Sequence, residues 1–396
     1  MAFEETVIAG FSETEKSRAK TERGETFTSL EAYFQIAAKA TLDDANVEKT
    51  DVDGLGIGLP GVSVPYIYPS TVAETLGFES LEWVTTVDHG GSNAISLLLQ
   101  SALAVDAGIV DNMLCLGADT PVDPSRTEPF DAVPRGYQKN FVLPFGTQGP
   151  NSMLAHVQNA HAHRYGTTPE QLSEIAVTQR FHAIHNPLAY FDEPITKEDY
   201  LDSRMIADPI RLLDCVMRVN GAFGFFITNA EDANRDDVVR ITGFGECTNH
   251  AVTESPDPTI TGIEPAGERA CAMAGIEPTD VDFVQAYDDY PIIVLMQLED
   301  LGFCEKGAGG SFVEETDLRY DGDLPLNTSG GQLSVGQPGM GAGFVQLHEG
   351  IRQLRGDGGK RQVPDAERGI VTNVGGVAFG KNLQNAGVAV LERGDG

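Results

Sequence analysis

A glycine turn between a predicted strand and a predicted helix carries the first residues that could do chemistry. The stretch VDHGGSNAISLLLQ, from Val87 to Gln100, passes from a β-branched run through two glycines into a strongly apolar segment. Turns of this kind can present a nucleophile at their tip. Here the hydroxyl of Ser92 is the candidate, with His89 three residues earlier as its base. A serine at the start of a helix can instead cap that helix, so both roles stay open.

Other residue types that often form sites are spaced unfavourably. The five cysteines form no CxxC pair, which argues against a zinc site and a disulfide framework. His182 and His185 share a helix face but lack a third ligand, so we expect no bound metal. The glycine-rich stretches TSGGQLSVG and QPGMGAGF lack the ending of a phosphate-binding loop. Close backbone packing explains these glycines better.

The elements around the turn alternate between strands and helices. Strands are predicted at residues 52–61, 81–88 and 112–119, and a helix at residues 92–107 that is apolar nearly all round. A helix without a polar face is expected to be buried on all sides. Strand–helix–strand spacing of this kind indicates a parallel sheet with crossover helices.

The second part of the chain repeats this theme. We predict an N-terminal half at residues 1–232, with a loop excursion over about residues 120–210, and a C-terminal half at residues 239–396. The polar, acidic residues 229–237 are the predicted linker. A strand, a glycine turn and a buried helix recur in similar order in both halves. This weak internal symmetry indicates a duplicated α/β unit.

The charge balance is strongly acidic, with 27 basic residues against 59 acidic ones and a formal net charge of −32. Nucleic acid and anionic membranes are poor partners for such a surface. The acidic residues are spread along the chain, which favours the hydrated surface of a halophilic protein over a local patch for a cationic partner. The sequence has no apolar run of about 18 residues and no signal-like N-terminus, so we expect a cytoplasmic protein.

Six stretches between residue 50 and residue 396 form a specific pattern in a fixed order: HRYGTTPEQLSEIAVTQRFHAIHNPLA, SRMIADPIRLLDC, VNGAFGFFI, QAYDDY, LPLNTSGGQLSVGQPGMGAG and QLRGDGG. In these stretches the chain resembles the thiolase superfamily, specifically its sterol-carrier-protein-type and lipid-transfer-type branch. The resemblance implies the α/β thiolase fold, in which two mixed sheets and their helices form five layers. It also implies a coenzyme A thioester as substrate, no further cofactor, and a homodimer.

The positions of the family's catalytic residues hold other residue types. The elbow cysteine falls on or beside Gly91, and the HDAF histidine becomes Tyr287. The GHP histidine becomes Gln337, and the second cysteine becomes Asn373. The middle DGA motif has Asn220 in place of its aspartate. The usual Cys–His–Cys thiolase mechanism therefore cannot operate in this chain.

The substituted residues suggest a different chemistry. The chain resembles thiolase-related retro-aldolases in carrying a tyrosine where thiolases have the HDAF histidine. Tyr287 would act on a β-hydroxyl proton, although Asp288 and Asp289 next to it would raise its pKa and oppose its ionisation. The amides of Gln337 and Asn373 cannot shuttle protons, but they can donate to a thioester oxygen. The alternative is a tyrosine that only packs at a strand end.

The resemblance also implies which residues contact the coenzyme A thioester: Gly91, Asp288, Asn327, Ser329, Gly330, Gly336, Gly375 and Gly376. We predict an acyl-CoA enzyme that makes or breaks a carbon–carbon bond next to the thioester, similar to an acetyl-CoA acyltransferase. The alternatives are a retro-aldolase that uses Tyr287 and a noncatalytic acyl-CoA or lipid-binding subunit. By resemblance we also expect a small partner protein with an OB-fold and a zinc ribbon.

Overall fold

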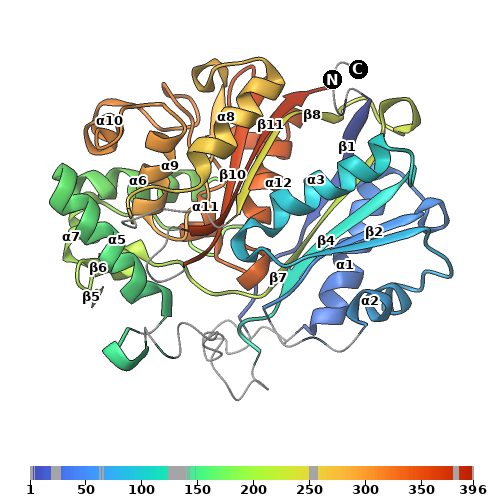
Figure 1. The fold of residues 1–396 in the computed structure, drawn as a ribbon, viewed down its shortest axis with the longest axis horizontal. Coiled ribbons are helices and arrows are strands. Elements are labelled where there is room, and N and C mark those ends of the chain that lie inside the picture. Colours follow the sequence, from blue (N-terminus) through green and yellow to red (C-terminus); the bar gives the residue numbers. More distant parts are fainter. Residues whose placement is uncertain are drawn as a thin grey trace.

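The computed structural model describes residues 5–18, 28–61, 67–123, 143–147, 149–248, 257–377 and 383–394, together with Phe3, Val64 and Asn140. Its main feature is a nine-stranded mixed sheet in the order β3-β2-β4-β7-β1-β8-β11-β10-β9 (Figure 1). A separate two-stranded hairpin pairs β5 (Met205–Ala207) with β6 (Ile210–Arg211). Both ends of the main sheet are formed by strands that lead directly into the candidate site.

The N-terminal strands form one half of the sheet: β1 (Thr6–Glu13), β2 (Gly54–Gly58), β3 (Trp83–Val87), β4 (Met113–Asp119) and β7 (Gly221–Asn229). β2 runs parallel to β3 and β4, as the crossover pattern predicts, and β7 pairs antiparallel with β4 and β1. The strands expected at residues 52–61, 81–88 and 112–119 are confirmed. Sequence patterning did not predict β1.

The C-terminal strands repeat this order: β8 (Val239–Thr248), β9 (Phe283–Gln285), β10 (Arg368–Val377) and β11 (Leu383–Arg393). Their order in the sheet is β8-β11-β10-β9. At the position that corresponds to β3 of the N-terminal half, the described residues form only an isolated parallel bridge between Val284 and Leu326. The two half-sheets meet where β1 pairs with β8, through Val7–Arg240 and Ile8–Val239. The repeated order agrees with the duplicated unit that the sequence indicates.

Helices separate and cover the half-sheets. α3 (Asn93–Asp106) and α12 (Phe344–Arg355) touch each other and strands of both halves, so they form a central layer (Figure 1). α1 (Leu30–Ala45) and α2 (Tyr68–Leu76) cover the N-terminal strands, whereas α8 (Ile263–Ala274) and α9 (Pro291–Asp300) cover the C-terminal strands. The succession of helices, strands, helices, strands and helices is the five-layer fold that the resemblance implies.

The central helix α3 is less enclosed than its apolar sequence predicts. Leu103 on α3 is 46% exposed, and Val84 on the edge strand β3 is 37% exposed. The expectation that this helix is buried on all sides is therefore wrong. The physical reason is its position beside β3, because no further strand extends the sheet beyond β3 in the described part of the chain.

The described part of the excursion after β4 is mainly helical. It contains α5 (Gly149–Tyr165), α6 (Pro169–Ala183) and α7 (Lys197–Asp202). Thr168 and Gln171 form a capping box at the start of α6, which fixes where that helix begins. α6 packs against α9, α10 (Gly309–Glu315) and α11 (Gly331–Val335), so the excursion closes over the C-terminal half.

Candidate active site

The glycine turn of the elbow lies between β3 and α3 as a single turn of 3₁₀-helix, η2 (Gly90–Ser92). Gly91 has no room for a side chain, because a Cβ atom there would lie 2.3 Å from the Tyr287 hydroxyl oxygen. The same Cβ would lie 2.4 Å from the carbonyl oxygen of Val374. The Tyr287 hydroxyl therefore fills the space in which a nucleophilic side chain at position 91 would begin.

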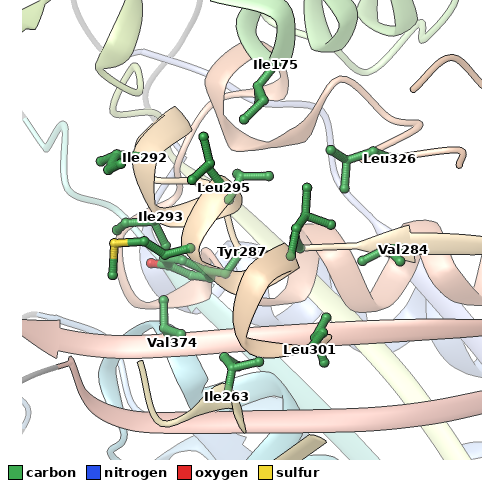
Figure 2. Close-up of a cluster of buried hydrophobic side chains, with 14 of the residues drawn as sticks. Ile175, Ile263, Val284, Tyr287, Ile292, Ile293, Leu295, Leu301, Leu326 and Val374 are labelled. Carbon is green, nitrogen blue, oxygen red and sulfur yellow. The ribbon is translucent and has the colours of Figure 1, made fainter. Parts of the chain in front are cut away.

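Tyr287 follows the end of β9 and is held at both of its backbone groups. Its N–H donates to the Thr372 hydroxyl (3.2 Å), and its carbonyl accepts from Nε2 of Gln297 (2.7 Å). The Thr372 hydroxyl in turn donates to Oε1 of Gln297 (2.6 Å). Figure 2 shows the tyrosine ring inside a cluster of apolar side chains, near Ile293 of α9 and Val374 of β10. The tyrosine is 4% exposed, so its ring is fixed by packing and its backbone by hydrogen bonds.

The Tyr287 hydroxyl is coupled to a carboxylate on the same turn. It lies close to the Asp289 carboxylate, whose Oδ1 accepts a hydrogen bond from Nε2 of Gln337 (2.6 Å). Burial raises the pKa of the phenol well above its ordinary value, and the Asp289 charge raises it further. Burial also raises the pKa of Asp289 to about 6, against the lowering effect of the neighbouring Gln337 amide and Tyr287 hydroxyl. At neutral pH the phenol is a proton donor and the carboxylate is the group that can accept a proton.

Asp288 has a different environment from its neighbour. It is fully buried and accepts four hydrogen bonds: from the backbone N–H groups of Gln332 (2.9 Å) and Leu333 (3.2 Å), and from the side-chain amides of Gln179 (2.9 Å) and Gln346 (2.5 Å). Burial raises its pKa well above the ordinary value, while these donors oppose that rise. The carboxyl thus joins α6, α11 and α12. Contact between Asp288 and a coenzyme A thioester stays a prediction.

Ser92 and His89 lie on the elbow, but their side chains take different directions. The Ser92 oxygen is buried, makes no capping bond to α3, and has no hydrogen-bond partner among the described residues. The His89 ring contacts other partners through Nδ1, namely Ser96 Oγ (2.8 Å) and Glu246 Oε1 (3.0 Å). The hydrogen bond to Glu246 raises the pKa of His89. Within the described residues, no base lies within hydrogen-bond reach of Ser92. The Ser92 side chain does not cap α3 either.

Asn373 is a buried anchor in this geometry. Its Nδ2 donates to the carbonyls of Thr372 (2.7 Å) and Gly343 (3.1 Å), and its Oδ1 accepts from the backbone of Ile95 (3.3 Å). These bonds tie β10 to the start of α3 and to the residue before α12. Both amide hydrogens are engaged, so donation from Asn373 to a thioester oxygen would require one of these bonds to break.

The NTSGG motif packs tightly against its surroundings. Asn327 accepts from the backbone of Ala286 (2.6 Å), while its Nδ2 is buried without a partner among the described residues. Ser329 Oγ accepts from the Gly331 N–H (3.1 Å). A Cβ at Gly330 would lie 2.6 Å from the Cβ of Ala183. Asn327 thus holds the residue that precedes Tyr287, and contact of this motif with coenzyme A stays a prediction.

The other predicted glycines also make close backbone approaches. A Cβ at Gly336 would lie 2.8 Å from Val219, and one at Gly375 would lie 2.0 Å from the carbonyl oxygen of His89. Gly376 follows with a φ of 72°, in the left-handed region that favours glycine. These contacts bring β10 against the elbow, and they explain the glycines without reference to a ligand.

His182 is a neutral packing residue. Its Nδ1 donates to the carbonyl of Asn327 (3.1 Å), and its Nε2 accepts from the N–H of Tyr320 (3.0 Å). Burial lowers its pKa to about 4. Within the described residues, no group of three or more His, Cys, Asp or Glu side chains is arranged to hold a metal ion. No described helix is long and apolar enough to cross a membrane.

Sequence reasoning missed several residues of this site. Gln297 and Thr372 fix the backbone of Tyr287, but they lie on other elements and carried no motif signal. Glu246, the partner of His89, lies 157 residues from it. Asp289 had a signal, because it stands two residues after Tyr287 in AYDDY, but its role depends on which of the two consecutive carboxylates faces the phenol.

Several known proteins are similar to the chain in sequence, and one solved structure shares its fold. The family model described as "Thiolase C-terminal domain-like" matches residues 245–393. An acetyl-CoA acetyltransferase of Methanothermobacter thermautotrophicus is 33% identical over 86% of this chain and 90% of its own length. A steroid side-chain-cleaving aldolase of Thermomonospora curvata is 32% identical over 88% of this chain and 90% of its own length. The solved structure of an Ltp2-ChsH2(DUF35) aldolase superposes with a TM-score of 0.84 at 28% identity, and covers 99% of both chains.

These matches define the class of protein: the chain belongs to the thiolase superfamily. Sterol carrier protein 2 of Gallus gallus and of Bos taurus also matches over 86% of the chain, which confirms the sterol-carrier-protein-type branch expected from the motifs. The similar proteins include both acetyltransferases and carbon–carbon lyases. The site geometry must therefore decide between these activities.

Proposed function

We propose that the chain cleaves the bond between the α- and β-carbons of a β-hydroxyacyl-CoA by retro-aldol chemistry, with Tyr287 as the acid–base group. The observation that carries the proposal is the position of the tyrosine hydroxyl, beside Gly91 and close to Asp289. Retro-aldol cleavage requires proton transfer and a stabilised enolate oxygen, but no covalent acyl-enzyme. The names of the similar aldolases support the same choice.

Acyl transfer through Ser92 is the second candidate, and the similarity to an acetyl-CoA acetyltransferase favours it. A serine nucleophile needs a base within hydrogen-bond reach. The buried Ser92 oxygen has none among the described residues, because the His89 ring is directed to Glu246. A noncatalytic acyl-CoA-binding subunit is the third candidate, and the coupled Tyr287–Asp289 pair argues against it.

The test uses the purified chain in molar KCl, with any small protein that co-purifies retained. β-Hydroxyacyl-CoA esters of several chain lengths, with and without a steroid side chain, are assayed for a carbonyl product and a shortened acyl-CoA. Acetoacetyl-CoA with coenzyme A is assayed for thiolysis. We expect cleavage that falls about 10²- to 10⁴-fold in Tyr287→Phe, without loss of ester affinity, and that persists in Ser92→Ala.

Two results would contradict the proposal. Thiolysis that disappears in Ser92→Ala would establish a serine-based acyltransferase. Tight binding of the esters with no turnover, even with the co-purifying protein present, would establish a binding subunit.

We also propose that the chain works as a homodimer with a small OB-fold partner. The exposed Val84 on the edge strand β3 and Leu103 on α3 support an apolar contact there. The solved aldolase structure is named for two components, Ltp2 and ChsH2, which supports the small partner. Size measurement by light scattering with Leu103→Glu tests the dimer, and affinity purification from the native host tests the small partner. A monomeric wild-type chain without a companion protein would contradict both.

The acidic composition supports a further proposal, that the chain works in a salt-rich cytoplasm. With a net charge of −32, the acidic side chains repel one another in dilute buffer. Near 1 M salt the Debye length shortens to about 3 Å, so this repulsion is screened. The thermal midpoint of unfolding should therefore rise as KCl is increased to molar concentration. A midpoint that is independent of KCl would contradict this proposal.

A further inference from the structure

We infer that Asp289, held by Gln337, is the proton acceptor that acts through the Tyr287 hydroxyl during carbon–carbon cleavage. The inference deepens the proposed function and rests on it. It assigns the proton-accepting step to a carboxylate that does not itself touch the substrate. Asp289 is in this sense a positioning and relay residue, whereas Tyr287 is the catalytic group.

The first argument is the contrast between the two consecutive carboxylates. Asp288 is fully buried, and four N–H donors occupy its oxygens. Asp289 is only partly buried; its carboxylate accepts a hydrogen bond from the Gln337 amide and lies beside the Tyr287 hydroxyl. Of the two, Asp289 is therefore the carboxylate that can take up a proton without breaking a structural network.

The second argument concerns the phenol. A buried tyrosine beside two carboxylates stays protonated, because burial and both negative charges raise its pKa. It can nevertheless take a proton from a substrate hydroxyl if it passes its own proton on in the same step. Asp289 lies beside this hydroxyl and is the carboxylate that can serve as that acceptor. The titratable groups that face Asp289 are Tyr287 and Asp288 on its own turn, and the uncharged Gln337 faces it from the loop before α12.

The third argument concerns Gln337, at the position where thiolases carry the GHP histidine. Its backbone N–H donates to Met217 (2.7 Å) and its carbonyl accepts from Val219 (3.1 Å), so the residue is anchored on both sides. Its Nε2 then meets Asp289 at 2.6 Å. A neutral amide orients the carboxylate but adds no positive charge, which a protonated histidine would add and which would weaken the carboxylate as a base.

The step is balanced without any further reactant. The O–H bond of the substrate's β-hydroxyl breaks, its proton goes to the Tyr287 oxygen, and the phenol proton goes to Asp289. The bond between the α- and β-carbons breaks, the β-carbon becomes a carbonyl, and the electron pair forms the enolate of the shortened acyl-CoA. Return of one proton from Asp289 through Tyr287 to the α-carbon yields the acyl-CoA and resets the pair.

The experiment is a pH–rate profile of β-hydroxyacyl-CoA cleavage by the full chain with its co-purifying protein. In the wild type we expect kcat/KM to fall on the acid side with a midpoint near the Asp289 pKa of about 6. Asp289→Asn should lower kcat about 100-fold, abolish this acid limb and leave KM little changed. Asp289→Glu should restore part of the rate and the acid limb. Asp51→Asn, which removes an exposed carboxylate of the N-terminal half, is the charge-matched control.

A second measurement needs no turnover. The negative charge of Asp289 raises the pKa of Tyr287, so Asp289→Asn should lower it. The shift is read from the ultraviolet titration of phenolate, as the difference between each protein and the same protein carrying Tyr287→Phe. Circular dichroism at neutral pH checks that the Asp289→Asn variant keeps its fold.

The outcomes separate the two proposals. A wild type that cleaves no β-hydroxyacyl-CoA overturns the proposed function and the relay with it. A wild type that cleaves, together with an Asp289→Asn variant that keeps the rate and the acid limb, overturns the relay alone. The relay is also overturned if Asp289→Asn abolishes the acid limb of the pH–rate profile but leaves the pKa of Tyr287 unchanged. The carboxylate would then act without the phenol.

Discussion

The elbow turn and the AYDDY strand end meet at one place in the molecule, yet they differ in what they contribute. The elbow comes from the N-terminal half and presents Gly91 without a side chain and Ser92 without a described partner. The strand end comes from the C-terminal half and presents a phenol coupled to a carboxylate. Atoms in a packed interior exclude one another, so the Tyr287 hydroxyl and a side chain at position 91 cannot occupy the same space. A nucleophilic side chain at position 91 and the Tyr287 phenol therefore exclude each other.

The largest effect should follow from restoring a side chain to the elbow. Gly91→Ala places a Cβ 2.3 Å from the Tyr287 oxygen and 2.4 Å from a backbone carbonyl, so the tyrosine or the elbow must move. We expect loss of most β-hydroxyacyl-CoA cleavage and a decrease of about 1–3 kcal/mol in the free energy of unfolding. Steady-state kinetics and chemical denaturation measure the two effects.

The matched control for this change is Gly341→Ala. A Cβ there lies no closer than 3.7 Å to its neighbours, so the variant should keep its stability to within about 1 kcal/mol. A Gly91→Ala variant as active and as stable as Gly341→Ala would show that the tyrosine does not occupy this space.

A smaller effect should follow from a substitution that perturbs Asp289 but keeps both Tyr287 and Asp289. Gln337→Leu removes the amide that donates to Asp289, and this hydrogen bond lowers the pKa of the carboxyl. Its loss raises that pKa, so the acid limb of the pH–rate profile should move to higher pH by about one unit. An acid limb that stays in place, or moves to lower pH, would contradict the assignment of the limb to Asp289.

The smallest effect concerns the elbow histidine. The hydrogen bond to Glu246 raises the pKa of His89, so the bridge stabilises the fold fully below the unfolded pKa of about 6.5, and this contribution is lost as the pH rises through the folded pKa. Both side chains are partly exposed, so we expect Glu246→Gln to cost no more than about 1 kcal/mol, at low pH only.

Chemical denaturation at about pH 5.5 and about pH 8.5 measures this difference against the wild type. Cleavage activity should stay unchanged, because the bridge does not touch the Tyr287–Asp289 pair. A loss of activity in Glu246→Gln at a pH where it is fully folded would instead return the chemistry to the elbow.

The contrast between Asp288 and Asp289 shows where sequence reasoning stopped. The expectation that carboxylates beside Tyr287 raise its pKa agrees with the structure. The sequence could not tell which carboxylate is the partner, because consecutive residues differ only in the direction of their side chains. That direction depends on α6, α11 and α12, whose N–H groups converge on Asp288 from residues 44 to 109 positions away.

The sequence by itself determined the fold family, the strands around the elbow, the duplicated order of elements and the loss of the thiolase cysteines. These depend on local periodicity and on motifs that are continuous in the chain. Only the tertiary structure decided that α3 is partly exposed, that Ser92 and the His89 ring diverge, and that the Tyr287 hydroxyl fills the space beside Gly91. Each of these is a contact, or a missing contact, between elements from distant parts of the chain. Residue types and spacing specify elements, but only the packing of one element against another fixes where a side chain points and what it can donate to.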